Sequence, residues 1–297
     1  MTGPESKSLS IVRDEIRWPF DGSELRVGFD RAGTGPTVLL LPALSSISTR
    51  GEMRPLLERL APSFTTIAFD WPGFGEQPKP FIDWQPHLYL AFLAHLLTRV
   101  APAPYATVAA GHAAGYLIRH VAQNAHAAGR CVLLSPTWRG PLPTMMGRHS
   151  PRLRTIARAF DRPAVGPLLF RLNVNRFMIT MMARGHVYAD PGWLTGERMQ
   201  AKLAAALTPG ARHASARFVT GCLDPFSNRE DFLNAIRCIN DPILALFSNN
   251  APRKSRAEME ALAASAGVTT VRLPAGKLSI YEEFPDESAR AILKFIA

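Results

Sequence analysis

The pentapeptide Gly111-His112-Ala113-Ala114-Gly115 is the most informative stretch of this 297-residue chain. It lies between residues 106–110, a short apolar run typical of a buried strand, and residues 113–127, whose spacing predicts a helix. Glycines allow a strand-to-helix turn so tight that its central residue stands exposed, and a serine at that centre acts as a nucleophile. Here the central residue is Ala113. Because a methyl group cannot attack a carbonyl carbon, the turn indicates a scaffold without its usual chemistry.

Strands and helices alternate on both sides of this turn. The predicted strands are residues 12–18, 25–31, 37–41, 65–69, 106–110, 131–134, 243–247 and 269–273. The predicted helices are residues 52–60, 87–100, 113–127, 255–266 and 286–297. Asp21-Gly22 predicts a tight hairpin turn between the first two strands. This alternation predicts an α/β fold with a mostly parallel central sheet and helices on both faces.

Residues 139–217 interrupt the alternation with a helical, strongly basic segment, which we interpret as an inserted cap. The cap holds thirteen Lys and Arg but only three acidic residues, Asp161, Asp190 and Glu197, so it carries the whole net charge of +10. The core, residues 1–138 and 218–297, is therefore neutral. Arg154, Arg158 and Arg162 recur every four residues and are expected on one helix face. We expect the apolar stretch from Phe170 to Met182 to pack on the core, with ligand lining as the alternative.

Four stretches, each at the end of a predicted strand, follow the order and spacing of one superfamily. They are Leu39-Leu40-Leu41-Pro42-Ala43, Asp70-Trp71-Pro72-Gly73-Phe74-Gly75-Glu76, Gly111 to Gly115, and Leu273-Pro274-Ala275-Gly276-Lys277 leading to Glu282-Glu283-Phe284-Pro285. With these motifs the chain resembles the α/β-hydrolase superfamily over nearly its whole length. The resemblance implies an α/β-hydrolase fold with a helical cap inserted after the strand that ends at Leu134.

The same resemblance implies a catalytic triad, which needs a nucleophile, a base and an acid. The corresponding positions hold Ala113, Lys277 and Ala251, so none of the three has its catalytic residue type. An engineered Ser-to-Ala change would explain Ala113 but leave Lys277 and Ala251 unexplained, whereas a naturally triad-less protein explains all three. A misaligned triad built from Ser45 or Ser46 with His112 and Asp70 is the remaining alternative.

Part of a binding site is expected to survive without the triad. In the superfamily, backbone N–H groups corresponding to Ala114 and to Ala43 or Leu44 point at an oxyanion. A helix N-terminus favours an anion whatever side chain it carries. We therefore predict a ligand site formed by Ala43, Leu44, Ser45, Ala113 and Ala114.

Three residues are candidates for proton transfer if the protein is an enzyme of another kind. Lys277 has a lowered pKa if it projects into a partly dry pocket, with a solvated loop lysine as the alternative. His112 adjoins the turn centre and is otherwise a packing residue. Asp70 ends a strand at the sheet edge where ligands of such folds collect, and otherwise holds its own loop.

The leading prediction is a protein that binds a small, partly apolar, anionic ligand under its cap and has no serine-hydrolase chemistry. One alternative is a lyase, isomerase, decarboxylase-like enzyme or unusual hydrolase that uses Lys277, His112 or Asp70. The other is an interaction protein whose cap docks on an acidic protein or an anionic membrane. No cofactor, metal or nucleic-acid partner is expected. Three cysteines, no secretory leader and no span of 18 apolar residues predict a cytoplasmic protein without a transmembrane segment.

Overall fold

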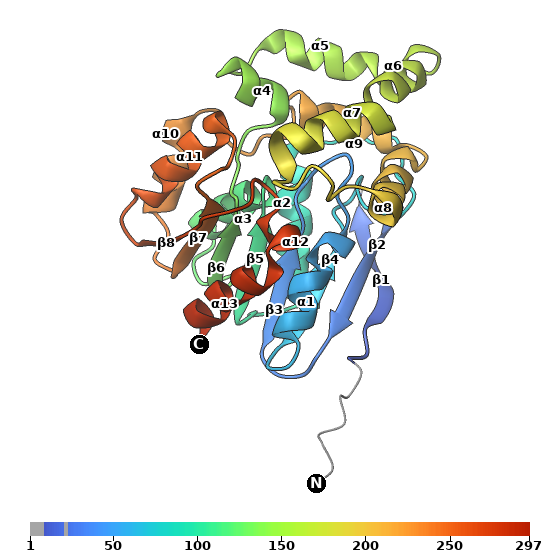
Figure 1. Ribbon diagram of the computed structural model, residues 1–297. Coiled ribbons are helices and arrows are strands. Elements are labelled where there is room, and N and C mark those ends of the chain that lie inside the picture. Colours follow the sequence, from blue (N-terminus) through green and yellow to red (C-terminus); the bar gives the residue numbers. More distant parts are fainter. Residues whose placement is uncertain (1–8, 21–22) are drawn as a thin grey trace.

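The computed structural model describes residues 9–20 and 23–297. An eight-stranded sheet forms its centre, in the order β1-β2-β4-β3-β5-β6-β7-β8 (Figure 1). The strands are β1 Val12–Phe20, β2 Ser23–Ala32, β3 Thr37–Leu41, β4 Thr65–Phe69, β5 Ala106–Ala110, β6 Arg130–Leu134, β7 Ile243–Ser248 and β8 Val268–Leu273. β1 and β2 pair antiparallel and β2 joins β4 antiparallel, whereas every pair from β4 to β8 is parallel. The predicted mostly parallel sheet is therefore confirmed, while the predicted turn at Asp21-Gly22 lies outside the described residues.

Helices cover both faces of the sheet because apolar side chains alternate between the two faces of each strand. One face packs against α1 Arg54–Leu60, α12 Ile280–Glu283 and α13 Pro285–Ile296. The other face packs against α2 Pro86–His95, α3 Ala113–Gln123, α10 Arg229–Arg237 and α11 Arg253–Ala263. The predicted helix over residues 113–127 ends earlier, at Gln123, and the predicted helix over residues 87–100 becomes α2 followed by one π-helical turn at Leu96–Val100.

The cap, residues 139–217, lies over one end of the sheet, above the ends of β5 and β6 (Figure 1). Its helices are α4 Pro141–Met146, α5 Pro151–Ala159, α6 Val165–Asn173, α7 Arg176–Met182, α8 Gly196–Leu207 and α9 Ala211–Val219, whose last turn extends past it. Arg162 lies beyond the end of α5, so it does not share a helix face with Arg154 and Arg158 as predicted. Among the described residues, no helix is both long and apolar enough to cross a bilayer.

The expectation that the cap's apolar stretch packs on the core is only partly correct. Phe170 and Ile179 are buried, but Leu172, Phe177, Met181 and Met182 are exposed. The reason is geometric, since α6 and α7 are short helices and each turns only one narrow side toward the rest of the protein. Apolar side chains therefore remain on the outer surface of the cap.

Candidate functional site

The chain passes from β5 into α3 through a turn at Gly111. Gly111 has φ +51°, and a Cβ there would lie 3.1 Å from that of Ala43. The Gly111 N–H donates to the carbonyl of Leu134 at 2.9 Å, which fixes the turn to β6. Ala113 opens α3 and is fully buried in the same apolar cluster as Leu44 and Trp71. The central residue of the turn is thus buried, whereas the sequence predicts an exposed one, because its methyl group packs in the core.

The predicted ligand-binding backbone is only partly free. The Ala114 N–H donates to the Gly111 carbonyl at 3.2 Å, and Ser45 Oγ accepts the Ile47 N–H at 3.3 Å. Within residues 9–20 and 23–297, the amides of Ala43 and Leu44 donate no hydrogen bond. These two amides are the donors that could still receive an anion, and the binding role of the five residues stays a prediction.

His112 is held beside the turn by contacts with Leu223 and Asp224, and not by contacts with Ser45, Ser46 or Asp70. Its Nε2–H donates to the Leu223 carbonyl at 3.1 Å, and the Asp224 carboxylate lies 3.5 Å from Nε2. Burial lowers the pKa of His112, although Asp224 opposes that shift, so the ring is neutral near pH 7. Nδ1 is buried and has no partner among the described residues.

Asp224 is a central residue of this region that sequence reasoning missed. It accepts the Gly140 N–H at 2.8 Å and lies 2.6 Å from Nε2 of the half-buried His149. The carboxylate thus joins the first residues of the cap to the turn beside His112. No periodicity marks it, because its partners lie 75 to 112 residues away in the sequence.

Asp70 is fixed by Arg50, a second residue that the sequence did not single out. Asp70 Oδ1 accepts the Arg50 N–H at 2.7 Å, and the Arg50 guanidinium pairs with Asp70, Asp30 and Glu76. Burial raises the pKa of Asp70 against the opposing effect of Arg50. Burial alone would lower the pKa of Arg50, but its three carboxylates raise it. The contacts make Asp70 a structural anchor of its loop.

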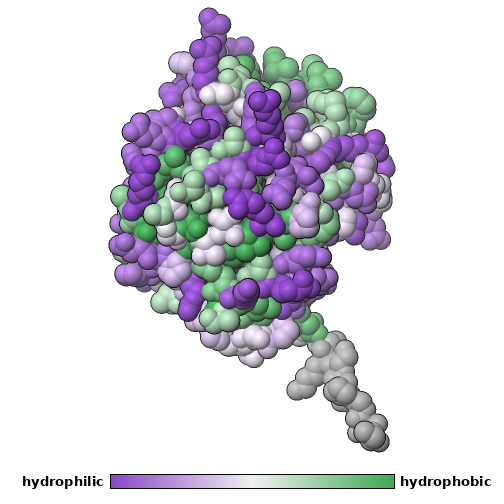
Figure 2. Space-filling model, turned by 60° about the vertical axis from the view of Figure 1, so that its left-hand side comes forward, coloured by the Kyte–Doolittle hydropathy of each residue, from purple (hydrophilic) through white to green (hydrophobic). Residues whose placement is uncertain are grey.

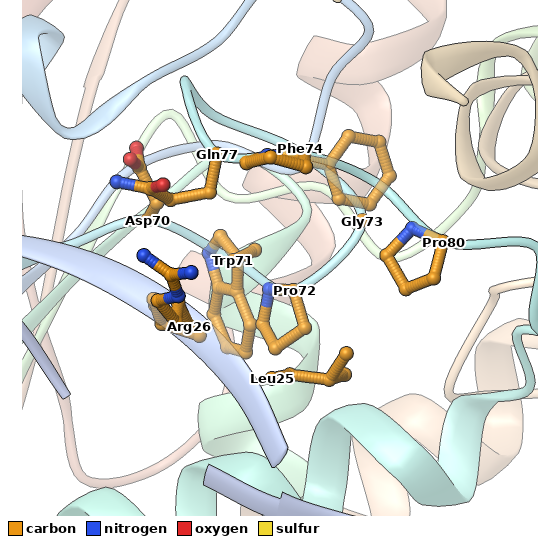
Figure 3. Close-up of a pocket in the computed structure, with 11 residues that line it drawn as sticks. Leu25, Arg26, Asp70, Trp71, Pro72, Gly73, Phe74, Gln77 and Pro80 are labelled. Carbon is orange, nitrogen blue, oxygen red and sulfur yellow. The ribbon is translucent and has the colours of Figure 1, made fainter. Parts of the chain in front are cut away.

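The recess beside Asp70 is too small for an organic ligand. Trp71, Pro72, Gly73 and Phe74 line it, with Asp70 at one end and Pro80 at the other (Figure 3). Its volume is about 10 Å³. That space holds one water molecule at most.

Lys277 contacts the cap. Its ammonium donates to the Arg184 carbonyl at 2.5 Å, and the neighbouring amides of Leu278 and Ser279 donate to the Val187 carbonyl. The core loop that carries Lys277 is thereby joined to the cap segment around Val187.

Ala251, which the resemblance places at the acid position, also makes structural contacts. Ala251 is buried in the turn after β7, where its N–H donates to Ser248 at 3.2 Å. Within the described chain, no hydrogen bond links Ser45 or Ser46 with His112 or Asp70, so the alternative triad is not assembled. Lys277, His112 and Asp70 likewise make no contact with one another and bond to three different parts of the protein.

A cavity of about 130 Å³ lies between α5, the end of α9 and the loop before α2. Its lining consists of Asp83, Gln85, Arg154, Ala157, Arg158, Arg217 and Cys222. Arg217 is buried, and its guanidinium pairs with Asp161 at 2.9 Å and with Asp83 at 3.0 Å. Arg154 and Arg158 form no ion pair with any carboxylate of residues 9–20 or 23–297. The two local carboxylates are occupied by Arg217, so the cavity has uncompensated positive charge.

Metal chemistry has no candidate in the described ranges, which contain no group of three His, Cys, Asp or Glu side chains placed to hold an ion. The cavity lined by Arg154, Arg158 and Arg217, here called the arginine cavity, is the site that the sequence predicted in part. The four-residue spacing of Arg154 and Arg158 indicated a shared face, but Arg217, Gln85 and Asp83 are brought to it only by the fold.

Comparisons with known proteins agree on the architecture. The sequence profile of the alpha/beta hydrolase family matches residues 38–291. No curated protein has a significant sequence match to the chain. Similar solved structures include an esterase from Thermogutta terrifontis, with a TM-score of 0.74, 17% identity, and coverage of 96% of this chain and 98% of that one.

Two further structures show the same similarity. A haloalkane dehalogenase from Agrobacterium tumefaciens has a TM-score of 0.70 and 18% identity over 96% of this chain and 97% of its own. A bromoperoxidase from Bacillus anthracis has a TM-score of 0.71 and 14% identity over 95% and 99%. At such identities the three structures show a common fold.

Proposed function

The chain belongs to the alpha/beta hydrolase family, and on that premise we propose that it has no serine-hydrolase activity and binds a small, partly apolar anion beneath its cap. The neighbours with this fold are an esterase, a dehalogenase and a bromoperoxidase. In this chain the three positions that would carry the triad hold Ala113, Lys277 and Ala251, and each is committed to packing or to a structural hydrogen bond. These contacts support the loss of hydrolase chemistry.

The arginine cavity is the single observation that carries the ligand assignment. Arg154 and Arg158 are exposed to it and unpaired by the described carboxylates, while the apolar Ala157 lies between them on α5. Hydrogen bonds from arginine to a carboxylate or phosphate are strong and directional. The volume of about 130 Å³ suits a phosphate or carboxylate group with a small apolar substituent.

The wall of the arginine cavity also adjoins the residues that contact the turn at Gly111. Cys222 lines the cavity, and the next residue, Leu223, accepts hydrogen bonds from His112 and Tyr116 through its carbonyl. An anion in the cavity would therefore lie one residue from the contacts that hold His112. Cys131, Cys222 and Cys238 are free thiols, and we propose a reducing, cytoplasmic location on that ground.

The ligand proposal is tested by calorimetry with phenyl phosphate, using benzyl alcohol as the uncharged counterpart. We expect Arg154→Gln/Arg158→Gln to weaken phenyl phosphate binding by about tenfold or more, because two charge-assisted contacts are lost. The matched control is Arg148→Gln/Arg152→Gln, which removes two exposed cap arginines outside the cavity. Equal weakening in both double variants would assign the effect to general cap charge and contradict the site.

The absence of hydrolase chemistry is tested with p-nitrophenyl acetate and butyrate. We expect no turnover above the buffer rate by the wild-type protein, and no change on Ala113→Gly. Hydrolysis by the wild-type protein that Ala113→Gly abolishes would overturn this part of the proposal. Native mass spectrometry of freshly purified protein complements both tests, because a retained anion would identify the ligand directly.

A further inference from the structure

Large apolar side chains on the cap are exposed to an unusual degree. On α6, Val165, Leu168 and Leu172 share the outer side, and on α7 Phe177 and Met181 do the same at a spacing of four. The side chain exposures reach 61% for Leu168, 63% for Leu172 and 74% for Phe177. Figure 2 shows hydrophobic side chains at the upper right of the molecule, beside hydrophilic ones, in the part that the cap occupies. Large apolar side chains exposed together on two consecutive helices indicate an interaction site.

The same two helices carry positive charge without any acidic residue. Residues 162–189 contain four arginines and no Asp or Glu. Arg171 and Arg176 are exposed and, within residues 9–20 and 23–297, form no ion pair with a carboxylate. Each adjoins an exposed apolar residue, Leu172 and Phe177 respectively. Cationic and apolar groups are therefore interleaved on one surface.

Packing of the cap does not account for these apolar residues. The inward side of α6 is supplied by Gly166 and Phe170, and that of α7 by Ile179. A surface helix that only covers a core keeps polar residues on its opposite face. The outer apolar side chains of α6 and α7 therefore make no contribution to the packing of the core.

We propose that α6 and α7 dock the protein on the surface of an anionic lipid bilayer. Leucine, phenylalanine and methionine enter the boundary between headgroups and acyl chains, while Arg171 and Arg176 pair with lipid phosphates. An apolar strip flanked by arginines is the pattern of a helix that lies in the membrane interface. The net charge of +10, all of it in the cap, is complementary to an anionic surface. This docking surface is separate from the arginine cavity and goes beyond the proposed ligand binding.

The contribution of the exposed apolar side chains is tested by flotation with vesicles of phosphatidylcholine, with or without an equal part of phosphatidylglycerol. We expect the wild-type protein to float with the anionic vesicles only, and Leu168→Gln/Leu172→Gln/Phe177→Gln to bind at least about tenfold more weakly because apolar burial is lost. The control Val12→Gln/Leu207→Gln changes two exposed apolar residues away from α6 and α7 and is expected to bind like the wild-type protein. Thermal unfolding verifies that every variant is folded.

The charge arm uses Arg171→Glu/Arg176→Glu, with Arg99→Glu/Arg253→Glu as a control of equal charge change on exposed core arginines. We expect only the first variant to lose flotation by about tenfold or more, since cations near an anionic surface are attracted to it and the introduced carboxylates are repelled. No flotation of the wild-type protein, or equal losses in test and control variants, would overturn the proposal. A dimer in light scattering that Leu168→Gln/Leu172→Gln/Phe177→Gln dissociates, without vesicle binding, would instead assign the surface to a second copy. Phenyl phosphate binding is measured on the same variants, so failure of the two proposals can be told apart.

Discussion

At the scale of single residues, the loop after β4 depends on Gly75 and on Arg50, which the sequence alone did not single out. Asp70 holds the loop from Trp71 to Glu76 only because Arg50 supplies both a backbone N–H and a guanidinium. Gly75 completes this arrangement, since its φ is +72° and any Cβ there would overlap the Asp70 carboxyl group. The same loop holds Gly73, with φ +79° and 2.9 Å from an added Cβ to Ala214, but the closest approach is at Gly75.

We predict that Gly75→Ala destabilises the protein by about 3 kcal/mol or more, because backbone strain and a clash with Asp70 add together. Gly147→Ala is the matched control, since its φ is +75° but nothing lies within 4 Å of the added Cβ. That control is expected to cost only about 1 kcal/mol. Urea denaturation measures both. Equal costs would mean that the contact with Asp70 contributes nothing.

At the scale of elements, a buried ion cluster joins the cap to the core. Lys202 of α8 pairs with Glu52 in the 3-10 turn Arg50–Met53 and, at 3.1 Å, with Glu282 of α12. Tyr281 donates to Glu52, and Tyr188 donates to Glu282 at 2.5 Å. Two carboxylates thus share one ammonium, so full ionisation leaves an excess negative charge in a dry place.

This arrangement makes stability depend on pH. Burial raises the pKa of Glu52 to about 7, with Lys202 opposing and Glu282 reinforcing the shift. Because the folded state holds this proton more tightly than the unfolded state, the contribution of Glu52 to stability falls as pH rises from about 4.5 to 7.

We predict that Glu52→Gln removes this dependence. The free energy of unfolding of Glu52→Gln minus that of the wild-type protein should increase by up to about 3 kcal/mol from pH 5 to pH 8. Urea denaturation at four pH values measures the difference. Glu230→Gln, at an exposed position, is expected to stay parallel to the wild-type protein throughout. Parallel curves for Glu52→Gln as well would show that the carboxylate is ionised across the range.

At the scale of the whole molecule, burial and charge are divided unevenly. β5 and the last four residues of β6 are fully buried at the centre of the sheet, whereas α6 and α7 each bury one or two side chains. The net positive charge is confined to the same cap that exposes the apolar side chains. The core is therefore the rigid part, and the outer cap is held by few contacts.

Hydrogen exchange should reflect this division. We predict that backbone amides of residues 165–182 exchange well before those of β5 and β6, because local opening costs least where few apolar contacts are lost. Mass spectrometry of peptides across both regions measures the rates. Anionic vesicles should slow exchange in residues 165–182 and leave β5 unchanged. Cap amides as protected as those of β5 would contradict the predicted difference in local stability.

The sequence by itself determined the fold, because the periods of strand and helix and the glycines at tight turns are local properties. The runs 37–41 and 106–110 appear in the structure as predicted, and the run 131–134 lies within β6 Arg130–Leu134. The location of charge in residues 139–217 is likewise a property of the sequence.

Only the tertiary structure decided the surroundings of each site residue. Arg217 meets Asp83 across 134 residues of chain, Lys202 meets Glu52 across 150, and Asp224 meets His112 across 112. Such pairings leave no periodic trace in the sequence, because they arise from loops that the sheet brings to one edge. The same holds for exposure, since apolar residues such as Phe177 and Phe170 are equivalent in composition and differ only in which side of a helix meets the core.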